Sequence, residues 1–241
     1  MTRLVAAALC VTLGVATALV APEAATQSRG ARTAATPSDS ANVALLERTA
    51  ATYRGSRSLR AEFTQLITSA RGGTPMRSSG EFFQQGSQKF AFKFTTPADD
   101  RIVADGEVLW LYLPSTAKGQ VLKVPRAIGA GLDIAASVLR EPAKRFTITG
   151  LRDSTIENTA VRTIRLAPRS GSDAPFTKAT LWIDPKTAVV RRAEFTELSG
   201  LQRTLEFRKV RTGSALPAGV FTFTPPPGVK VIDQAALLTP R

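Results

Sequence analysis

Side chains capable of covalent or metal chemistry are scarce in this sequence. Histidine is absent and Cys10 is the only cysteine, which excludes Ser-His-Asp and Cys-His nucleophiles and zinc sites built from these residues. The candidates that remain are the carboxylates Asp99, Asp100, Asp105, Glu107, Glu194 and Glu197. They could form a glycosidase-type pair or a calcium site, but no EF-hand spacing, phosphate-cradling loop or dinucleotide fingerprint accompanies them. We therefore predict no catalytic activity, no cofactor and no metal ion.

The N-terminus predicts export. A short basic start precedes an apolar run from Leu4 to Val15, and Ala16-Thr17-Ala18 offers a small-x-small cleavage site. We predict a signal peptide over residues 1–25, with an uncleaved anchor as the alternative, and a flexible linker rich in Ala, Thr, Ser and Pro over 26–41. Lys and Arg outnumber Asp and Glu by 32 to 19, giving a net charge of +13. Such a charge attracts nucleic acid, anionic lipid or acidic protein surfaces, but export argues against a nucleic-acid partner.

The rest of the chain predicts many short strands and two helices. Helical spacing over about 38–55 and over 126–139 marks the helices, and Gly129 and Gly131 weaken the second. Strands are predicted near 58–68, 78–85, 88–95, 101–104, 107–113, 120–124, 145–149, 159–167, 176–183, 188–197, 202–211 and 220–224. This pattern predicts a mainly β (α+β) fold with a single, strongly curved antiparallel sheet, closed or incomplete.

Aromatic and aliphatic residues gather on particular strand faces. Phe90, Phe92 and Phe94 alternate along one strand and therefore share a face. Residues 108–113 do not alternate with polar residues, so both faces of that strand are apolar. We expect one face of the sheet to pack on the first helix, and the other to form a cavity for an apolar ligand beneath the second helix. The alternative is a filled core.

The basic stretch 201–213 (LQRTLEFRKVRTG) has two interpretations. Its Lys and Arg residues interleave with apolar ones, as in some nucleic-acid binders. Alternatively, it is an edge strand whose charges deter aggregation, with Leu205 and Phe207 sharing a face with Arg203 and Lys209. We favour the edge strand.

Several motifs in order resemble the periplasmic lipoprotein carriers of the LolA-like family. They are LRAEFTQ (59–65), GEFF (80–83), KFAFKFTTP (89–97), VADGEVLWLYLP (103–114), LWIDPKTAVVRRAEFTELSGLQRTLEF (181–207) and FTFTPPPGVKVID (221–233). The resemblance implies that residues 42–235 form an unclosed half-barrel that carries a helical lid. The apolar interior of this half-barrel would hold the acyl chains of a lipoprotein. We predict a cavity lined by Phe63, Phe83, Phe90, Phe92, Phe94, Trp110 and Leu111. We predict a lid formed by Ile128, Leu132, Ile134 and Leu139.

The resemblance also implies partners and a location. A monomer in the periplasm would take acylated lipoproteins from an inner-membrane ATP-driven release complex and pass them to an outer-membrane lipoprotein acceptor. Gly86 occupies the position where family members commonly carry an arginine associated with the lid. A lipid or lipoprotein sensor of the same fold without a transport role is therefore an alternative. A secreted carbohydrate-active enzyme and an adhesin for anionic surfaces are the remaining alternatives.

Overall fold

The computed structural model describes residues 37–125 and 134–235, all within the unit Ala35–Arg241. The predicted signal peptide and part of the predicted lid lie outside these residues. The helices are α1 (Pro37–Gly55), α2 (Ile134–Leu139) and α3 (Pro142–Arg145). The strands are β1 (Leu59–Ser69), β2 (Met76–Gln85), β3 (Lys89–Thr96), β4 (Arg101–Ala104), β5 (Val108–Tyr112), β6 (Gln120–Pro125), β7 (Phe146–Gly150), β8 (Ser154–Ile156), β9 (Thr159–Pro168), β10 (Phe176–Asp184), β11 (Val189–Glu197), β12 (Leu201–Thr212) and β13 (Lys230–Asp233).

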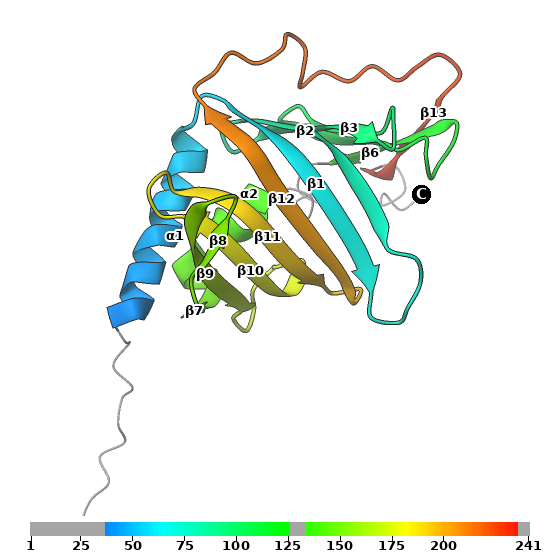
Figure 1. Cartoon of the computed structure of the whole chain (residues 1–241). Helices are drawn as coiled ribbons and strands as arrows, with labels where there is room; N and C mark the ends of the chain where they lie inside the picture. Colours follow the sequence, from blue (N-terminus) through cyan, green and yellow to red (C-terminus); the bar gives the residue numbers. More distant parts are fainter. Residues whose placement is uncertain (1–36, 126–133, 236–241) are drawn as a thin grey trace, which may run out of the picture. The chain divides into compact units, whose positions relative to one another are not determined.

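These strands form one curved sheet that does not close (Figure 1). The order is β13-β6-β5-β4-β3-β2-β1-β12-β11-β10-β9-β7, with β8 paired to β9. All pairs are antiparallel except β13 with β6. This confirms the predicted fold class, a mainly β protein with a single unclosed curved sheet. The predicted edge strand is wrong, because β12 pairs with β1 on one side and β11 on the other.

Alternation along the strands decides which side chains face the interior. In β1, Leu59, Ala61 and Phe63 are buried, whereas the residues between them are exposed. Successive strand residues point to opposite faces of a sheet, so one face of each strand contributes to a common core. Gly80 of β2 allows close strand contact, since a Cβ there would lie 2.1 Å from the carbonyl oxygen of Lys93 on β3.

Helices α1 and α2 both pack on the concave face of the sheet (Figure 1). Leu46 and Ala50 of α1 are fully buried in the same core cluster as Leu139 of α2. The backbone N–H of Val190 donates to the Tyr53 hydroxyl at 3.3 Å and ties α1 to β11. The prediction that the first helix and the cavity occupy opposite faces is therefore wrong. Helix α1 also begins at Pro37, within the range predicted to be linker.

The convex face of β2 to β5 is covered by the chain's own C-terminal segment, residues 213–229, which we call the strap. It connects β12 to β13 and is drawn in orange to red in Figure 1. The Phe223 ring lies 5.7 Å from that of Trp110 and 5.6 Å from that of Tyr112. The strap explains why β5 is apolar on both faces. Residues 220–224 therefore do not form the predicted strand. They belong to a turn, in which the Thr222 N–H donates to the Gly219 carbonyl.

Candidate functional site

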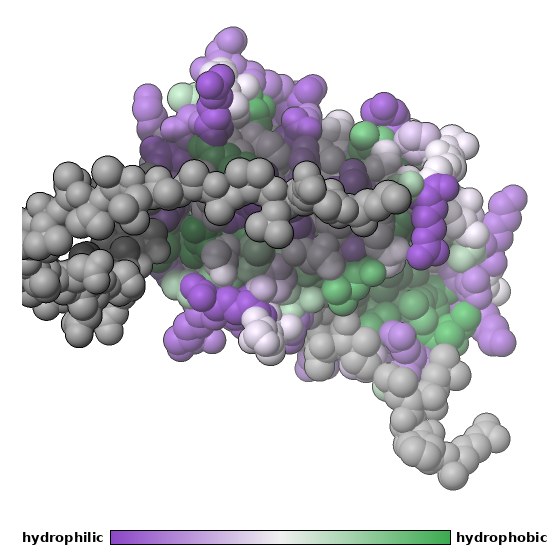
Figure 2. Space-filling view, turned by 90° about the horizontal axis from the view of Figure 1, so that it is seen from below, coloured by the Kyte–Doolittle hydropathy of each residue, from purple (hydrophilic) through white to green (hydrophobic). Residues whose placement is uncertain are grey.

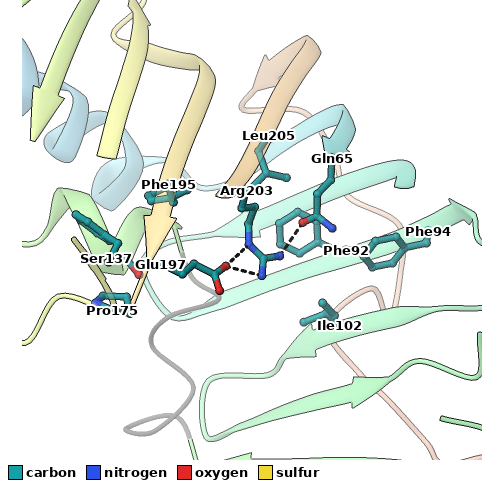
Figure 3. Close-up of a pocket in the computed structure, with 11 residues that line it drawn as sticks. Gln65, Phe92, Phe94, Ile102, Ser137, Pro175, Phe195, Glu197, Arg203 and Leu205 are labelled. Atoms are coloured by element: carbon teal, nitrogen blue, oxygen red, sulfur yellow. Dashed lines mark hydrogen bonds and ion pairs between the residues drawn. The ribbon is translucent and has the colours of Figure 1, made fainter. Parts of the chain in front are cut away.

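The concave face of the sheet contains an apolar cavity of about 240 Å³. Its walls come from β1, β3, β4, β10, β11 and β12, together with α2 (Figure 3). The lining residues are Gln65, Phe92, Phe94, Ile102, Ser137, Pro175, Phe176, Phe195, Glu197, Arg203 and Leu205. Aromatic and aliphatic side chains make up most of this surface, so the cavity suits an apolar ligand.

Edge-to-face contacts between phenylalanines hold one wall of the cavity in place. The Phe63 ring lies 5.0 Å from Phe92 and 5.2 Å from Phe94, each at an interplanar angle of 89°. Phe82 lies 4.7 Å from Phe92 on the neighbouring strand. Such pairs add to the free energy gained by burial and restrict the rings to one arrangement. The wall is therefore preformed rather than assembled around a ligand.

A second, wider hollow of about 540 Å³ continues the first. The two share Gln65, Phe94, Ile102 and Arg203. Leu111, Leu113 and Ile67 supply apolar surface to the second hollow. Together the two hollows form one continuous depression along the concave face, which we call the groove. Seen from below, hydrophobic residues gather in the middle of the molecule and towards one side, with hydrophilic residues around the margin (Figure 2).

A polar cluster centred on Arg203 lies where the two hollows meet. Arg203 Nε donates to Glu197 Oε1 at 2.8 Å, and Nη2 lies 2.8 Å from the same oxygen. Arg203 Nη1 donates to Gln65 Oε1 at 2.9 Å. Gln65 Nε2 in turn donates to Ser78 Oγ at 3.1 Å. Figure 3 shows the guanidinium between Glu197 and Gln65 at the centre of the site.

Most of the predicted cavity residues lie on the inner side of the sheet. Phe63, Phe90, Phe92, Phe94 and Leu111 belong to the interior cluster. Of these, Phe92 and Phe94 line the first hollow, and Phe94 and Leu111 line the second. Phe63 and Phe90 are buried beneath the residues that line the hollows, with 1% and 2% of their surface exposed to solvent. Whether any of them binds a ligand stays a prediction.

Two of the predicted cavity residues face the other way. Phe83 and Trp110 belong to a separate cluster on the convex face, where the strap covers them. The prediction that they line the cavity is wrong. The reason is the two-residue period of a strand: Phe82 and Leu109 point inward, so the next residue along each strand points outward.

The predicted lid is described only in part. Ile128 and Leu132 lie outside the described residues, and Ile134 is the first residue of α2. Leu139 is 4% exposed and belongs to the interior cluster. It borders a remaining space of about 20 Å³ together with Tyr53, Phe82 and Phe207. Leu139 therefore fills the inner end of the concave face in this structure.

Among the polar residues that line the groove without having been predicted to do so are the three of the central cluster, Gln65, Glu197 and Arg203. Each continues the inward alternation of its strand by one step, since Gln65 is two residues after Phe63, Glu197 two after Phe195, and Arg203 two before Leu205. That spacing was available as a signal. The interpretation of residues 201–213 as an edge strand gave its charges a role in deterring aggregation, so Arg203 was not predicted to line the groove.

Two of the candidate carboxylates, Asp105 and Asp100, have structural partners. Asp105 Oδ1 accepts the backbone N–H groups of Glu107 and Val108, each at 2.9 Å, at the turn before β5. Partial burial raises the pKa of Asp105, but these bonds and one from Trp110 outweigh it and lower the pKa. Asp100 accepts the Ser115 hydroxyl at 2.6 Å. Within 37–125 and 134–235, no three His, Cys, Asp or Glu side chains are grouped as metal ligands would be.

Gly86 lies in the turn between β2 and β3 with a φ of +59°. Its N–H donates to the Ser56 carbonyl at 3.2 Å, close to the end of α1. The position that departs from the family pattern thus belongs to a turn with a left-handed backbone, which favours glycine. Its effect on a lid stays a prediction.

Comparison with known proteins identifies the family. A model described as "Outer membrane lipoprotein carrier protein LolA" matches residues 54–224. The chain belongs to the LolA family. The outer-membrane lipoprotein carrier protein of Dechloromonas aromatica is 30% identical over 181 residues, 75% of this chain and 84% of that protein. The protein of the same name from Methylibium petroleiphilum is 32% identical over 177 residues, 73% and 82% of the two chains.

A solved structure shares the fold at much lower identity. An uncharacterized conserved protein from Thermus thermophilus matches with a TM-score of 0.50 and 11% identity, over 82% of this chain and 99% of that one. Membership of the LolA family confirms the resemblance seen in the sequence. LolA-family proteins are carriers rather than enzymes, so the prediction that this chain is not an enzyme is confirmed as well. None of the helices in the described part of the chain is long and apolar enough to span a membrane.

Proposed function

We propose that this LolA-family protein is a periplasmic carrier that binds the acyl chains of lipoproteins in the groove and moves them from the inner to the outer membrane. The observation that carries the proposal is an open apolar groove, walled by Phe92, Phe94, Phe176 and Phe195, in a chain whose relatives are named lipoprotein carriers. No chemical reaction is required for this function, only binding and release.

The energetic problem of a carrier is the exposure of acyl chains to water. Each methylene costs about 0.8 kcal/mol, so one long chain costs on the order of 10 kcal/mol. Burial against the phenylalanine walls offsets this cost at roughly 25 cal/mol per Å² of apolar area. Contacts among Phe63, Phe82, Phe92 and Phe94 hold the wall in place, so little of that gain is used to order the protein.

Release requires the empty protein to recover part of the binding free energy. We infer that Leu139 of α2 supplies such a contact in the empty protein, because it is buried next to Phe82 and Phe207. A ligand that displaces α2 must offset this contact, which lowers its net affinity. An inner-membrane ATP-driven release complex would load the carrier, and an outer-membrane lipoprotein acceptor would remove the cargo.

The test begins with the exported protein purified without detergent. Native mass spectrometry should detect bound acylated lipoprotein, and incubation with outer-membrane vesicles that contain the acceptor should transfer it. Leu113→Asp places a charge in the second hollow and should weaken lipopeptide binding at least tenfold. Val231→Asp is the matched control, because Val231 is 42% exposed and lies on β13; it should bind like the wild type.

The outcomes separate the functions. Binding together with transfer supports the carrier. Binding without transfer to acceptor vesicles would favour the lipoprotein sensor. If the wild type bound neither lipoprotein nor lipopeptide, or if Leu113→Asp and Val231→Asp bound equally well, the groove would not be the cargo site.

A further inference from the structure

Arg203 is a charged side chain in a groove built from apolar walls. Its side chain is only 22% exposed, and that of its partner Glu197 is 26% exposed. Removing charged groups from water costs free energy even when they are paired. Arg203 also borders both hollows of the groove, so the guanidinium stands at their junction.

The charges around Arg203 balance. The Glu197 carboxylate neutralises the guanidinium at 2.8 Å. Among the described residues, the other ionisable side chains that line the groove are Arg77 and Asp100, again one of each sign. An anionic ligand at Arg203 would therefore meet the Glu197 carboxylate at the same place. The arrangement favours an uncharged hydrogen-bond acceptor.

The guanidinium keeps hydrogen-bonding capacity for a ligand. It carries five N–H bonds. Within the described residues, Nε donates one to Glu197 and Nη1 donates one to Gln65, and Nη2 lies 2.8 Å from the same Glu197 oxygen as an ion pair. Even if the contact at Nη2 uses one N–H, two N–H bonds remain, one on Nη1 and one on Nη2. Glu197 and Gln65 approach from opposite sides (Figure 3) and hold the guanidinium in one orientation, so these donors are positioned before a ligand arrives.

We propose that Arg203 binds the ester carbonyl oxygens of the diacylglyceryl group at the cysteine of the cargo lipoprotein. The proposal rests on the carrier function proposed above. An ester carbonyl brought into an apolar cavity loses its water, and the remaining N–H bonds of Arg203 replace that water. With the head group held at the junction, one acyl chain extends along Phe176 and Phe195 and the other along Leu111 and Leu113.

The test compares two synthetic lipopeptides that differ only at the ester. One carries S-(2,3-dipalmitoyloxypropyl)cysteine, and the other carries the dihexadecyl ether analogue, which lacks the carbonyl oxygens. Their dissociation constants are measured for the wild type, for Arg203→Met and for Arg208→Met. Arg208 is the matched control, because it lies on the same strand but forms an exposed ion pair with Glu157.

The wild type and Arg208→Met should bind the ester about tenfold more tightly than the ether, as a hydrogen bond from a charged donor implies. For Arg203→Met, the dissociation constants of the ester and the ether should differ by less than twofold. A separate readout uses the ester labelled with ¹³C at its carbonyls: the infrared C=O band should move to lower frequency on binding to the wild type. This measurement needs no variant, so it holds even if Arg203→Met folds poorly.

Several results would overturn the proposal. Equal binding of ester and ether by the wild type leaves the carrier function intact but removes the role of Arg203. An unchanged ester preference in Arg203→Met gives the guanidinium a purely structural role. Salt-sensitive binding of palmitate that disappears in Arg203→Met, without an ester preference, would assign the site to an anion. If the wild type binds neither lipopeptide, the proposed function fails as well.

Discussion

Truncation of Leu139 tests whether the empty protein stores the free energy that drives release. The side chain is 4% exposed and borders a space of only about 20 Å³, between Tyr53, Phe82 and Phe207. Leu139→Ala removes three carbons, worth about 2 kcal/mol of burial, and leaves a cavity that costs about 1 kcal/mol more. The free energy of unfolding of the empty protein should therefore fall by about 3 kcal/mol, measured by urea denaturation.

The same substitution should strengthen cargo binding. If cargo displaces α2, the contact of Leu139 exists only in the empty state, and its loss does not destabilise the complex. About 3 kcal/mol corresponds to a dissociation constant for the diacyl lipopeptide that is lower by about one hundredfold. Titration of the lipopeptide into Leu139→Ala and into the wild type measures this shift.

Leu46→Ala is the matched control for this experiment. Leu46 is fully buried in the same cluster but belongs to α1. It should lose a similar amount of stability without any gain in affinity. A Leu139→Ala protein that loses stability but binds the lipopeptide no better than the wild type would refute the reasoning, because Leu139 would then keep its place in the loaded protein.

Two further predictions concern the strap and α1. Phe223→Ala removes the contacts with Trp110 and Tyr112. Limited proteolysis should therefore cut residues 213–229 faster in this variant than in the wild type. The free energy of unfolding should fall by about 1–2 kcal/mol, and the affinity for the lipopeptide should not change. Burial raises the pKa of Tyr53 from 10.0 to about 12. Because the unfolded chain ionises first, wild-type stability should fall by on the order of 2–3 kcal/mol as the pH rises from about 10 to about 12. Urea titrations over that pH range should show a smaller loss of unfolding free energy for Tyr53→Phe than for the wild type. Equal losses in the two proteins would contradict the attribution of this pH dependence to Tyr53.

Local patterns in the sequence were sufficient for much of this protein. The strands in KFAFKF and LRAEFTQ follow from two-residue alternation, and Asp105-Gly106 predicts the turn before β5 from its own chemistry. The absence of histidine excluded whole classes of site without any structure. These inferences succeed because neighbours along the chain determine the outcome.

Alternation separates the two faces of a strand but does not say which face is inside. Phe82 and Phe83 are equally apolar, and only the curvature of the sheet assigns the first to the interior and the second to the convex face. For β5, the apolar second face is explained by the strap, which reaches Trp110 from more than one hundred residues further along the chain. A cover so distant in sequence leaves no local signal.

The sequence by itself determined most of the strands, the turn before β5, the excluded chemistries and, through ordered motifs, the family. Only the tertiary structure decided that β12 lies within the sheet and that Arg203 faces the groove. The partners of Arg203 show why: Gln65 is 138 residues away, and the two meet only because β1 and β12 pair antiparallel. Strand pairing between distant segments depends on the packing of the whole sheet, and local propensity does not encode it.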